Sequence, residues 1–185
     1  MTRLTHRWLA RAAGAVVAAV LIAGSTAGAT FAAEADRTAK AAEAFLPTVD
    51  ITSNFAVVAT PHWDTVGCNG YKVVGKGTSI GKPLPNGGTW TQEEEACTAT
   101  VPGKWDIKAK ATITEPDGDK LNITYHLTAP VTQSNMVHPV GTFTITGGVG
   151  NYEFATGGGK MKARVNLLDH DHVSSTLVGD IQYLG

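Results

Sequence analysis

Hydrophobic and polar residues alternate with a period of two along most of the chain after Phe45, and this period constrains the fold more than any other feature. From Lys104 to Thr114 every second residue is apolar, beginning with Trp105, and the residues between are polar or charged. Side chains of a strand point alternately to its two faces, so this segment predicts a strand with one buried and one solvated face. The same alternation is found in residues 49–59, 121–127, 161–167 and 177–183.

Turn residues separate these segments. Pro116-Asp117-Gly118-Asp119 lies between residues 104–114 and 121–127, which predicts an antiparallel hairpin. No stretch of ten or more residues after Phe45 has a helical pattern. Six or more half-buried strands predict an all-β fold, either a closed barrel or a sandwich, and closure would remove the exposed strand edges.

Glycine is concentrated in one segment: seven glycines fall in the nineteen residues from Gly141 to Gly159, beside short alternating apolar runs. Glycine reaches positive φ without a Cβ penalty and lets another backbone approach closely. The segment therefore predicts a strand, a special turn and a second strand at the corner of a tightly coiled sheet.

The segment from Val66 to Gly103 differs from the rest, because it holds several prolines and glycines, the acidic run Glu93 to Glu95 and both cysteines. We interpret residues 66–103 as a long loop region tethered by a disulfide, with short strands around Tyr71 to Val74. Long ordered loops of this kind are often functional.

The N-terminus has the three parts of a secretory signal peptide: three arginines, an apolar stretch from Ala12 to Ala23, and small residues after it. Cleavage is predicted after Ala29 or after Ala35. The apolar stretch is too short for a membrane anchor, since a spanning helix needs roughly 20 apolar residues. The predicted organisation is a signal peptide (1–35), a flexible lead-in (36–47) and one β-barrel domain (48–185), which makes the protein secreted.

Removal of residues 1–35 leaves twelve basic and fifteen acidic residues, a net charge of −3. A mildly acidic chain without a basic block offers no electrostatic footprint for nucleic acid or for an anionic membrane surface. We therefore expect neither partner for the processed protein.

Cys68 and Cys97 are the two cysteines, and in an exported chain they predict one disulfide. The rival interpretation makes one of them a nucleophile. An oxidising compartment would consume a free thiolate, and no partner motif is nearby, so the disulfide is favoured.

The glycine segment also carries a family resemblance. Gly141-Thr142-Phe143-Thr144-Ile145-Thr146-Gly147-Gly148, followed by Tyr152 and Ala155-Thr156-Gly157-Gly158-Gly159, resembles the pattern of bacterial exported proteins in the allene oxide cyclase-like barrel group, to which plant dirigent proteins are related. The match covers residues 141–185. It implies an eight-stranded antiparallel barrel with a mostly apolar interior, often a trimer in the plant relatives, and it carries over no reaction.

The alternation also predicts the residues that face the barrel interior and could contact a ligand: Trp105, Tyr125, Phe143, Met161 and Tyr183. A barrel of eight strands is just wide enough either to fill itself with side chains or to hold one small ligand. Small inward residues such as Ala109 and Ala163 favour a cavity.

Two polar clusters are candidate sites. His62 and Asp64 follow the first strand at the expected rim, and a histidine beside a carboxylate can act as a general base when both face one substrate. Otherwise they are surface groups beside a rim tryptophan. His170 and His172 in Asp169-His170-Asp171-His172 could bind a transition metal. They also fall at a predicted hairpin tip, so we expect weak metal binding at most and no resident metal.

Recognised catalytic motifs are absent from the sequence: it has no G-x-S-x-G, P-loop, G-x-G-x-x-G or C-x-x-C motif, and we expect no cofactor. Three hypotheses for the function follow. The first is a barrel that binds a small apolar or phenolic molecule, the second a cyclase or isomerase that uses the same cavity with His62 or Asp64, and the third a structural or envelope-interaction protein with a filled barrel.

Overall fold

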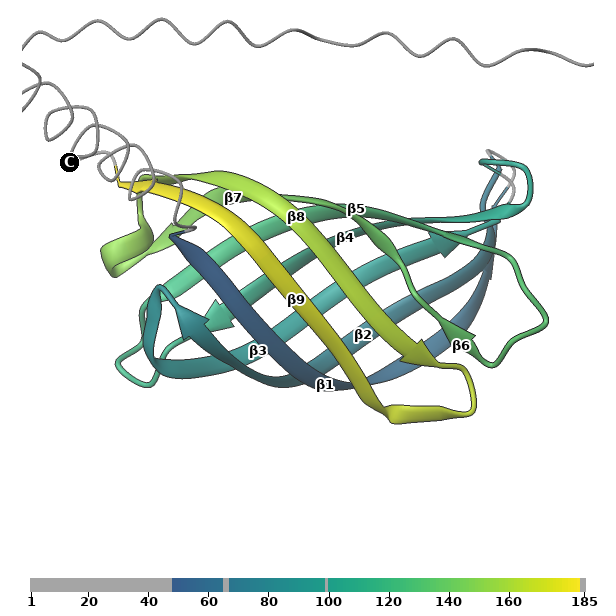
Figure 1. The fold of residues 1–185 in the computed structure, drawn as a ribbon, viewed down its shortest axis with the longest axis horizontal. Helices are drawn as coiled ribbons and strands as arrows, with labels where there is room; N and C mark the ends of the chain where they lie inside the picture. The colour runs from purple at the N-terminus through teal and green to yellow at the C-terminus, as the bar shows by residue number, and fades with distance from the viewer. Residues whose placement is uncertain (1–47, 65–66, 99, 184–185) are drawn as a thin grey trace, which may run out of the picture. The chain divides into compact units, whose positions relative to one another are not determined.

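The computed structural model of the protein describes residues 48–64, 67–98 and 100–183. Within them the chain forms one antiparallel sheet, in which eight long strands close into a barrel (Figure 1). This confirms the predicted all-β, eight-stranded antiparallel barrel. The signal peptide and the lead-in predicted for residues 1–47 lie outside the described residues. The long strands are β1 (Val49–Trp63), β2 (Asn69–Lys82), β3 (Leu84–Cys97), β4 (Lys104–Thr114), β5 (Lys120–Pro130), β7 (Val140–Val149), β8 (Ala155–Asn166) and β9 (Asp169–Tyr183).

Each long strand pairs with the next long strand in the sequence, and β9 returns to pair with β1. The short strand β6 (Met136–Val137) pairs with the end of β8. One 3₁₀ turn, η1 (Gly150–Tyr152), is the helical element of the described residues. The barrel is therefore a closed meander, in which local hairpins make all but one of the pairings between long strands.

The alternation of the sequence sets which side chains face inward. In β4, Ile107, Ala109, Ala111 and Ile113 are buried, and the lysines between them are exposed. β5 repeats this pattern, since Leu121, Ile123, Tyr125 and Leu127 are buried. The observed bounds of β4 are those of the predicted strand, and the predicted hairpin with β5 is present.

The prediction of a long loop region for residues 66–103 is wrong. Most of this segment forms β2 and β3, which pair from Gly70 with Cys97 to Ser79 with Gly88. Their inward positions include Gly75, Gln92 and Glu94, so the strands lack an apolar face that alternation could reveal. The glycines and acidic residues indicated a loop because the polar residues of these strands point both into the barrel and out of it.

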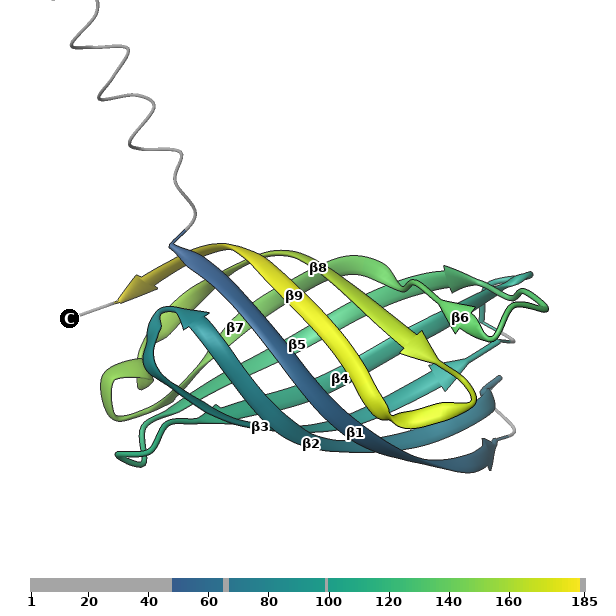
Figure 2. The same ribbon diagram turned by 60° about the horizontal axis from the view of Figure 1, so that its bottom comes forward.

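β1 and β9 pair along only part of their length. The ladder joins Val49 to Gly179 at one end and Phe55 to Val173 at the other. β1 continues beyond Phe55 to Trp63, and in the described residues β2 is its pairing partner there. Figures 1 and 2 show the two strands side by side along the ladder and separating where β9 turns back into β8.

The predicted glycine corner is present as β7, η1 and β8. Gly150 has a φ of 66°, and a Cβ there would lie 1.9 Å from Oδ1 of Asp119. A Cβ at Gly148 would lie 1.7 Å from the carbonyl oxygen of Lys120. Glycine is needed at these positions because the turn folds tightly against the start of β5.

The barrel interior near η1, here called the filled half, is packed with side chains. Ile51, Trp90, Ile113 and Leu121 are at most 1% exposed there. Tyr152 of η1 lies at this end, and its hydroxyl donates to Oε2 of Glu115 at 3.0 Å. The hydroxyls of Ser53 and Ser79 form another buried hydrogen bond at 2.7 Å. The filled half is thus a mainly apolar core that contains these two buried side-chain hydrogen bonds.

The predicted disulfide between Cys68 and Cys97 is confirmed, with an S–S distance of 1.98 Å and a sequence separation of 29 residues. It ties the loop between β1 and β2 to the end of β3. This is the end of the barrel opposite η1, and the interior there is here called the open half.

Candidate functional site

The open half contains a cavity of about 400 Å³. Its walls are mostly apolar and aromatic, and its polar lining consists of Gln92 and Glu94 on β3, Tyr125 on β5, Tyr71 on β2 and His170 at the mouth. Exposed residues such as Pro61 and Leu167 lie among the lining residues, so the cavity opens to solvent beside them. The lining is formed by Phe55, Val57, Ala59, Pro61, Tyr71, Val73, Gln92, Glu94, Ala96, Trp105, Ile107, Tyr125, Leu127, Val137, Pro139, Met161, Ala163, Val165, Leu167, His170 and Val173.

Stacked aromatic rings form the boundary between the cavity and the filled half. The rings of Phe55 and Trp90 are 5.5 Å apart and nearly parallel, and those of Trp90 and Tyr125 are 6.5 Å apart. Near the mouth, Tyr71 and Trp105 form another pair at 6.1 Å. Because aromatic pairs of this kind add to burial energy and have few rotatable bonds, they give the cavity a rigid floor and rim.

A chain of hydrogen bonds crosses this floor. Nε1 of Trp90 donates to Oε1 of Gln92 at 2.8 Å, and Nε2 of Gln92 donates to Oε2 of Glu94 at 3.3 Å. The hydroxyl of Tyr125 donates to the same Oε2 at 2.8 Å. Trp90, Gln92 and Glu94 are two residues apart on β3, so their side chains share the inner face. Each side chain in this set of hydrogen bonds has at least one partner.

Small residues leave space for these hydrogen-bonded side chains. Ala109 of β4 is the register partner of both Glu94 and Tyr125, so it lies between them on the inner face. A Cβ at Gly75 would lie 2.8 Å from the Gln92 side chain. Ala109 was predicted to leave space for a ligand, but it instead leaves space for the bond between Glu94 and Tyr125.

Burial perturbs both ends of the Glu94–Tyr125 pair. Loss of hydration raises the pKa of Glu94, and the hydrogen bond from Tyr125 opposes part of this rise. Burial and the nearby carboxylate raise the pKa of Tyr125 well above its ordinary value. Such a carboxyl, held in an apolar cavity with a hydroxyl donor, can bind a polar group or transfer a proton.

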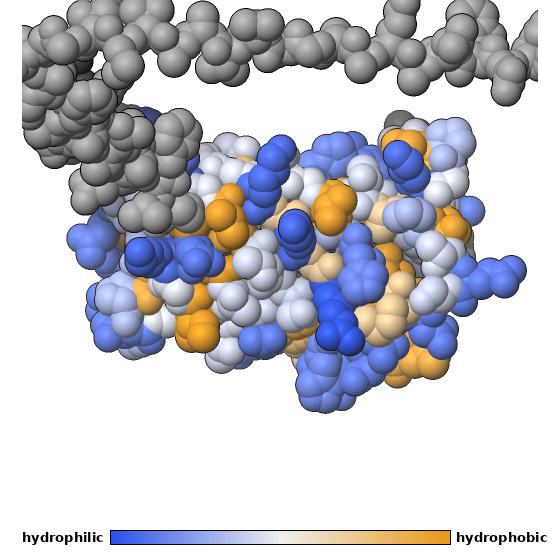
Figure 3. All heavy atoms as spheres, in the orientation of Figure 1, coloured by the Kyte–Doolittle hydropathy of each residue, from blue (hydrophilic) through white to orange (hydrophobic). Residues whose placement is uncertain are grey.

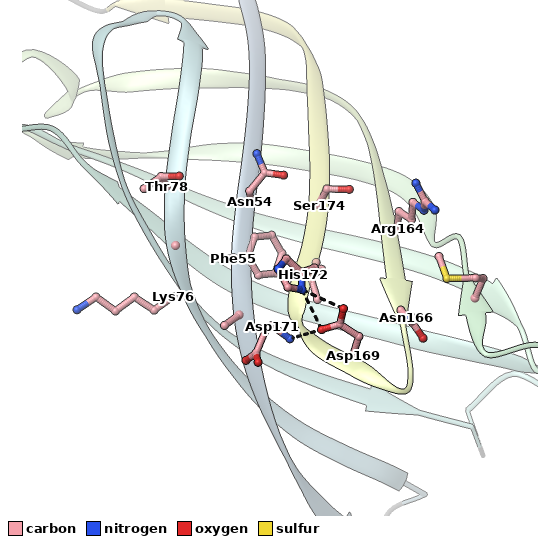
Figure 4. A pocket seen from close by; sticks show the side chains of 14 residues that line it. Asn54, Phe55, Lys76, Thr78, Arg164, Asn166, Asp169, Asp171, His172 and Ser174 are labelled. Atoms are coloured by element: carbon pink, nitrogen blue, oxygen red, sulfur yellow. Dashed lines mark hydrogen bonds and ion pairs between the residues drawn. The ribbon is translucent and has the colours of Figure 1, made fainter.

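Outside the barrel, a groove of about 510 Å³ lies where β1 and β9 separate (Figure 4). Phe55 and Val173, the last pair of the β1–β9 ladder, line both this groove and the interior cavity. The side chains of Lys76 and Arg164 point away from one another in Figure 4. The hydrogen-bonded pair in this groove, His172 and Asp169, is exposed, whereas the interior cavity has apolar walls around the partly buried Glu94–Tyr125 pair. The interior cavity is therefore the better candidate site.

The structure places the five predicted ligand contacts in three environments. Trp105, Tyr125 and Met161 line the cavity. Phe143 is buried in the core and does not line it. Tyr183, predicted to point inward, is 54% exposed and packs against Tyr152 at the opposite end, because β9 extends past the end of the packed interior there.

His62 and Asp64 do not line the cavity. Nε2 of His62 lies 3.7 Å from Oδ2 of Asp64, and Oδ1 of Asp64 accepts hydrogen bonds from the amides of Gly67 and Cys68, each at 2.8 Å. Asp64 thus shapes the loop that carries the disulfide. A reaction in the cavity would need other residues for proton transfer.

His170 and His172 are not brought to one site. His170 lies at the cavity mouth, whereas His172 lines the outer groove and its Nδ1 lies 2.9 Å from Oδ2 of Asp169 (Figure 4). This hydrogen bond lowers the pKa of Asp169 and raises the pKa of His172. In the part of the chain that the structure describes, neither histidine belongs to a group of three potential metal ligands.

Sequence reasoning does not identify Gln92 and Glu94, because they lie in a segment that was interpreted as a loop. The available signal was the spacing of Trp90, Gln92, Glu94 and Ala96, which places residues of mixed polarity on one strand face. A polar side chain in an inward position is informative once a strand is assigned, since burial demands a partner for it.

On the face drawn in Figure 3, hydrophobic residues are interspersed with hydrophilic ones. No helix in the described ranges is long and apolar enough to span a membrane. The fold and the site together define an antiparallel β-barrel whose interior is filled at one end and hollow at the other. Neither protein-family models, nor curated proteins, nor solved structures match the chain.

Proposed function

We propose that the protein is a secreted barrel that binds a small apolar or phenolic molecule in its interior cavity. The observation that carries the proposal is the cavity itself, about 400 Å³ lined mainly by apolar and aromatic side chains. Ligand pockets in proteins have this character, with a few placed polar groups that orient the ligand. The Cys68–Cys97 disulfide is in keeping with an oxidising, extracellular compartment. Membership in the allene oxide cyclase-like group, and a trimer as in its plant relatives, belong to the same proposal.

The test uses an uncharged fluorescent probe, N-phenyl-1-naphthylamine. We expect binding with roughly micromolar affinity, about 8 kcal/mol. Ala59 lines the cavity and Ala56 is exposed on the outer face of the same strand. Ala59→Phe should weaken binding at least about tenfold, because it fills the space, and Ala56→Phe should leave binding unchanged.

Both variants should keep the melting temperature of the wild type, since the ring added at position 59 enters empty space. In a filled barrel the same ring would overpack the core and cost about 1–3 kcal/mol. Absence of probe binding to the wild type, or loss of stability in Ala59→Phe without any effect on binding, would refute the proposal. The cavity of about 400 Å³ supports the binding proposal over the filled-barrel alternative.

A cyclase or isomerase is the second candidate, and one observation favours it. The cavity holds a carboxyl whose pKa burial raises, together with a hydroxyl donor 2.8 Å from it, which is a suitable arrangement for general acid catalysis. Its test is to extract the co-purified ligand, identify it by mass spectrometry, and incubate it with fresh protein. Conversion by the wild type but not by Glu94→Gln would support catalysis, and an unchanged ligand would support binding alone.

A further inference from the structure

One oxygen of Glu94 is left over by the hydrogen-bond chain. Oε2 accepts from both Tyr125 and Gln92, whereas Oε1 has no hydrogen-bond partner among the described residues. A buried side-chain oxygen without a partner occurs among the described residues at Ser175, not at Glu94. Oε1 of Glu94 is therefore not fully buried. Glu94 lines the cavity, so its Oε1 is available to a ligand there.

The charges around the cavity are one-sided. The ionisable residues that line it are Glu94 on β3, Tyr71 on β2, Tyr125 on β5 and His170 on β9, and no lysine or arginine is among the lining residues that the structure describes. His170 is exposed at the mouth. An anionic ligand would therefore enter a low-polarity site that contains a carboxyl and no deep cation, and a buried charge without a partner is costly.

A hydroxyl group fits Glu94 in either protonation state. It donates to Oε1 when the carboxyl is ionised, and it accepts from the carboxyl when that oxygen carries the proton. A ketone can only accept a hydrogen bond, so it fits the protonated carboxyl alone. The cavity that contains the carboxyl is also lined by Trp105, Leu127 and Met161, which match a ring or hydrocarbon body.

Building on the proposed function, we infer that Glu94 makes the cavity selective for charge: it takes uncharged molecules with an apolar body and one hydroxyl, phenols and alcohols, and it excludes carboxylates of the same shape. The hydroxyl sits on Oε1, and the aromatic floor and rim hold the body. Glu94 is thus the residue that determines specificity within the site.

The experiment compares four probes that share one ring system: naphthalene, 2-naphthol, 2-naphthoate and naphthalene-2-sulfonate, measured by equilibrium dialysis at pH 7.5. We expect 2-naphthol to bind about tenfold more tightly than naphthalene, as a hydrogen bond to a buried carboxyl predicts. The two anions should bind at least tenfold more weakly than 2-naphthol. Equal affinities for 2-naphthol and 2-naphthoate would overturn the inference.

Glu94→Gln is the decisive variant, because glutamine keeps the shape of glutamate and removes its charge. It should raise the affinity for both anions about tenfold and change that for 2-naphthol less than threefold, as expected when a repulsive charge is removed and a hydrogen-bonding group is retained. Glu95→Gln is the matched control, since Glu95 is exposed on the outer face of the same strand, where its Oε1 lies 3.8 Å from Nζ of Lys72. Unchanged discrimination in Glu94→Gln would also overturn the inference.

The sulfonate stays ionised at all pH values used, so its affinity reports on the protein. Burial raises the pKa of Glu94, and rejection of the sulfonate should weaken as the pH falls through that pKa. His170 also lines the cavity mouth, so the titration is repeated in His170→Asn, where the effect should persist, and in Glu94→Gln, where it should vanish. If naphthalene and 2-naphthol do not bind the wild type, the proposed function itself fails; if they bind without discrimination against the anions, the charge selectivity alone fails.

Discussion

The two halves of the barrel interior are built from the same strands and differ in what their inward side chains do. In the filled half, β1 pairs with β9 and most inward residues are large and apolar, with Ser53, Ser79 and Ser175 buried among them. In the open half, β1 has separated from β9, and inward positions hold Ala59, Gln92 and Glu94. The closed strand ladder surrounds a packed core, and the part of the barrel beyond the ladder surrounds the cavity that is the candidate site.

The largest expected effect tests whether stability resides in the filled half. Trp90 is fully buried, and Trp90→Ala should cost about 3–5 kcal/mol in the free energy of unfolding, as truncation of a buried aromatic residue does. Trp105 is half-buried at the rim, and Trp105→Ala should cost about 1 kcal/mol, typical of a substitution outside the packed core. Urea unfolding measures both. Equal losses would contradict the division into a filled and an open half.

The disulfide tests how the open half is held together without a β1–β9 ladder. It closes a loop of about thirty residues that contains β2 and β3, and removing it in Cys68→Ala/Cys97→Ala should cost about 3–4 kcal/mol on the chain-entropy estimate. Hydrogen exchange should accelerate first at the disulfide end of β2 and β3. Faster exchange throughout the filled half, with β2 and β3 protected, would show that the comparison is drawn in the wrong place.

Each half contains one hydrogen bond between a tyrosine and a carboxyl group, buried in the filled half and partly buried in the open half, and the two bonds predict smaller effects of different size. Tyr152→Phe leaves Glu115, which is 6% exposed, without its hydroxyl donor and should cost about 1–3 kcal/mol. Tyr125→Phe should cost about 1 kcal/mol or less, because Glu94 keeps the bond from Gln92 and can be hydrated in the cavity. A larger loss in Tyr125→Phe, measured by urea unfolding, would mean that the polar chain stabilises the fold more than it prepares the site.

The same contrast explains how much of the molecule could be predicted from the sequence. β4 and β5 bury aliphatic side chains at every second position, so their period predicts the strands and the barrel. β3 places Gln92 and Glu94 inward, and a polar inward face has no apolar period to detect. The segment that was interpreted incorrectly is therefore the one that contributes Gln92 and Glu94 to the candidate site.

His62 and Asp64 show the opposite limit. Their types and spacing match a catalytic pair, and only the strand register reveals that they lie outside the cavity and that Asp64 organises a loop. Sequence alternation beyond the last inward residue of a strand does not determine which way a rim residue points, because the loop that follows also contributes to its position.

The smallest effect concerns two carboxyl groups of the open half that lie on opposite faces of the barrel wall. Asp106 faces outward and is 5% exposed, and Nζ of Lys108 lies 3.2 Å from its Oδ2. His126 hydrogen-bonds its Oδ1. Burial alone would raise the pKa of Asp106, but these two partners outweigh it and lower the pKa. Glu94 faces inward, where the described lining residues include no lysine or arginine, and burial raises its pKa.

Because the pKa values of Asp106 and Glu94 shift in opposite directions, the two groups change the free energy of unfolding with pH in opposite directions. The lowered pKa of Asp106 stabilises the fold above the ordinary carboxyl pKa, and this contribution is lost as the pH falls through the lowered value. Asp106→Asn should therefore cost under about 1 kcal/mol at pH 7, since both partners are half-exposed, and nothing in strong acid.

The raised pKa of Glu94 stabilises the fold below the ordinary carboxyl pKa, and this contribution is lost as the pH rises through the raised value. Glu94→Gln should therefore match the stability of the wild type in acid and exceed it towards pH 8. Urea unfolding from pH 3 to 8 measures both differences, with the exposed Asp180→Asn as control; curves that run in the same direction would show that the two faces of the open half do not differ in charge environment.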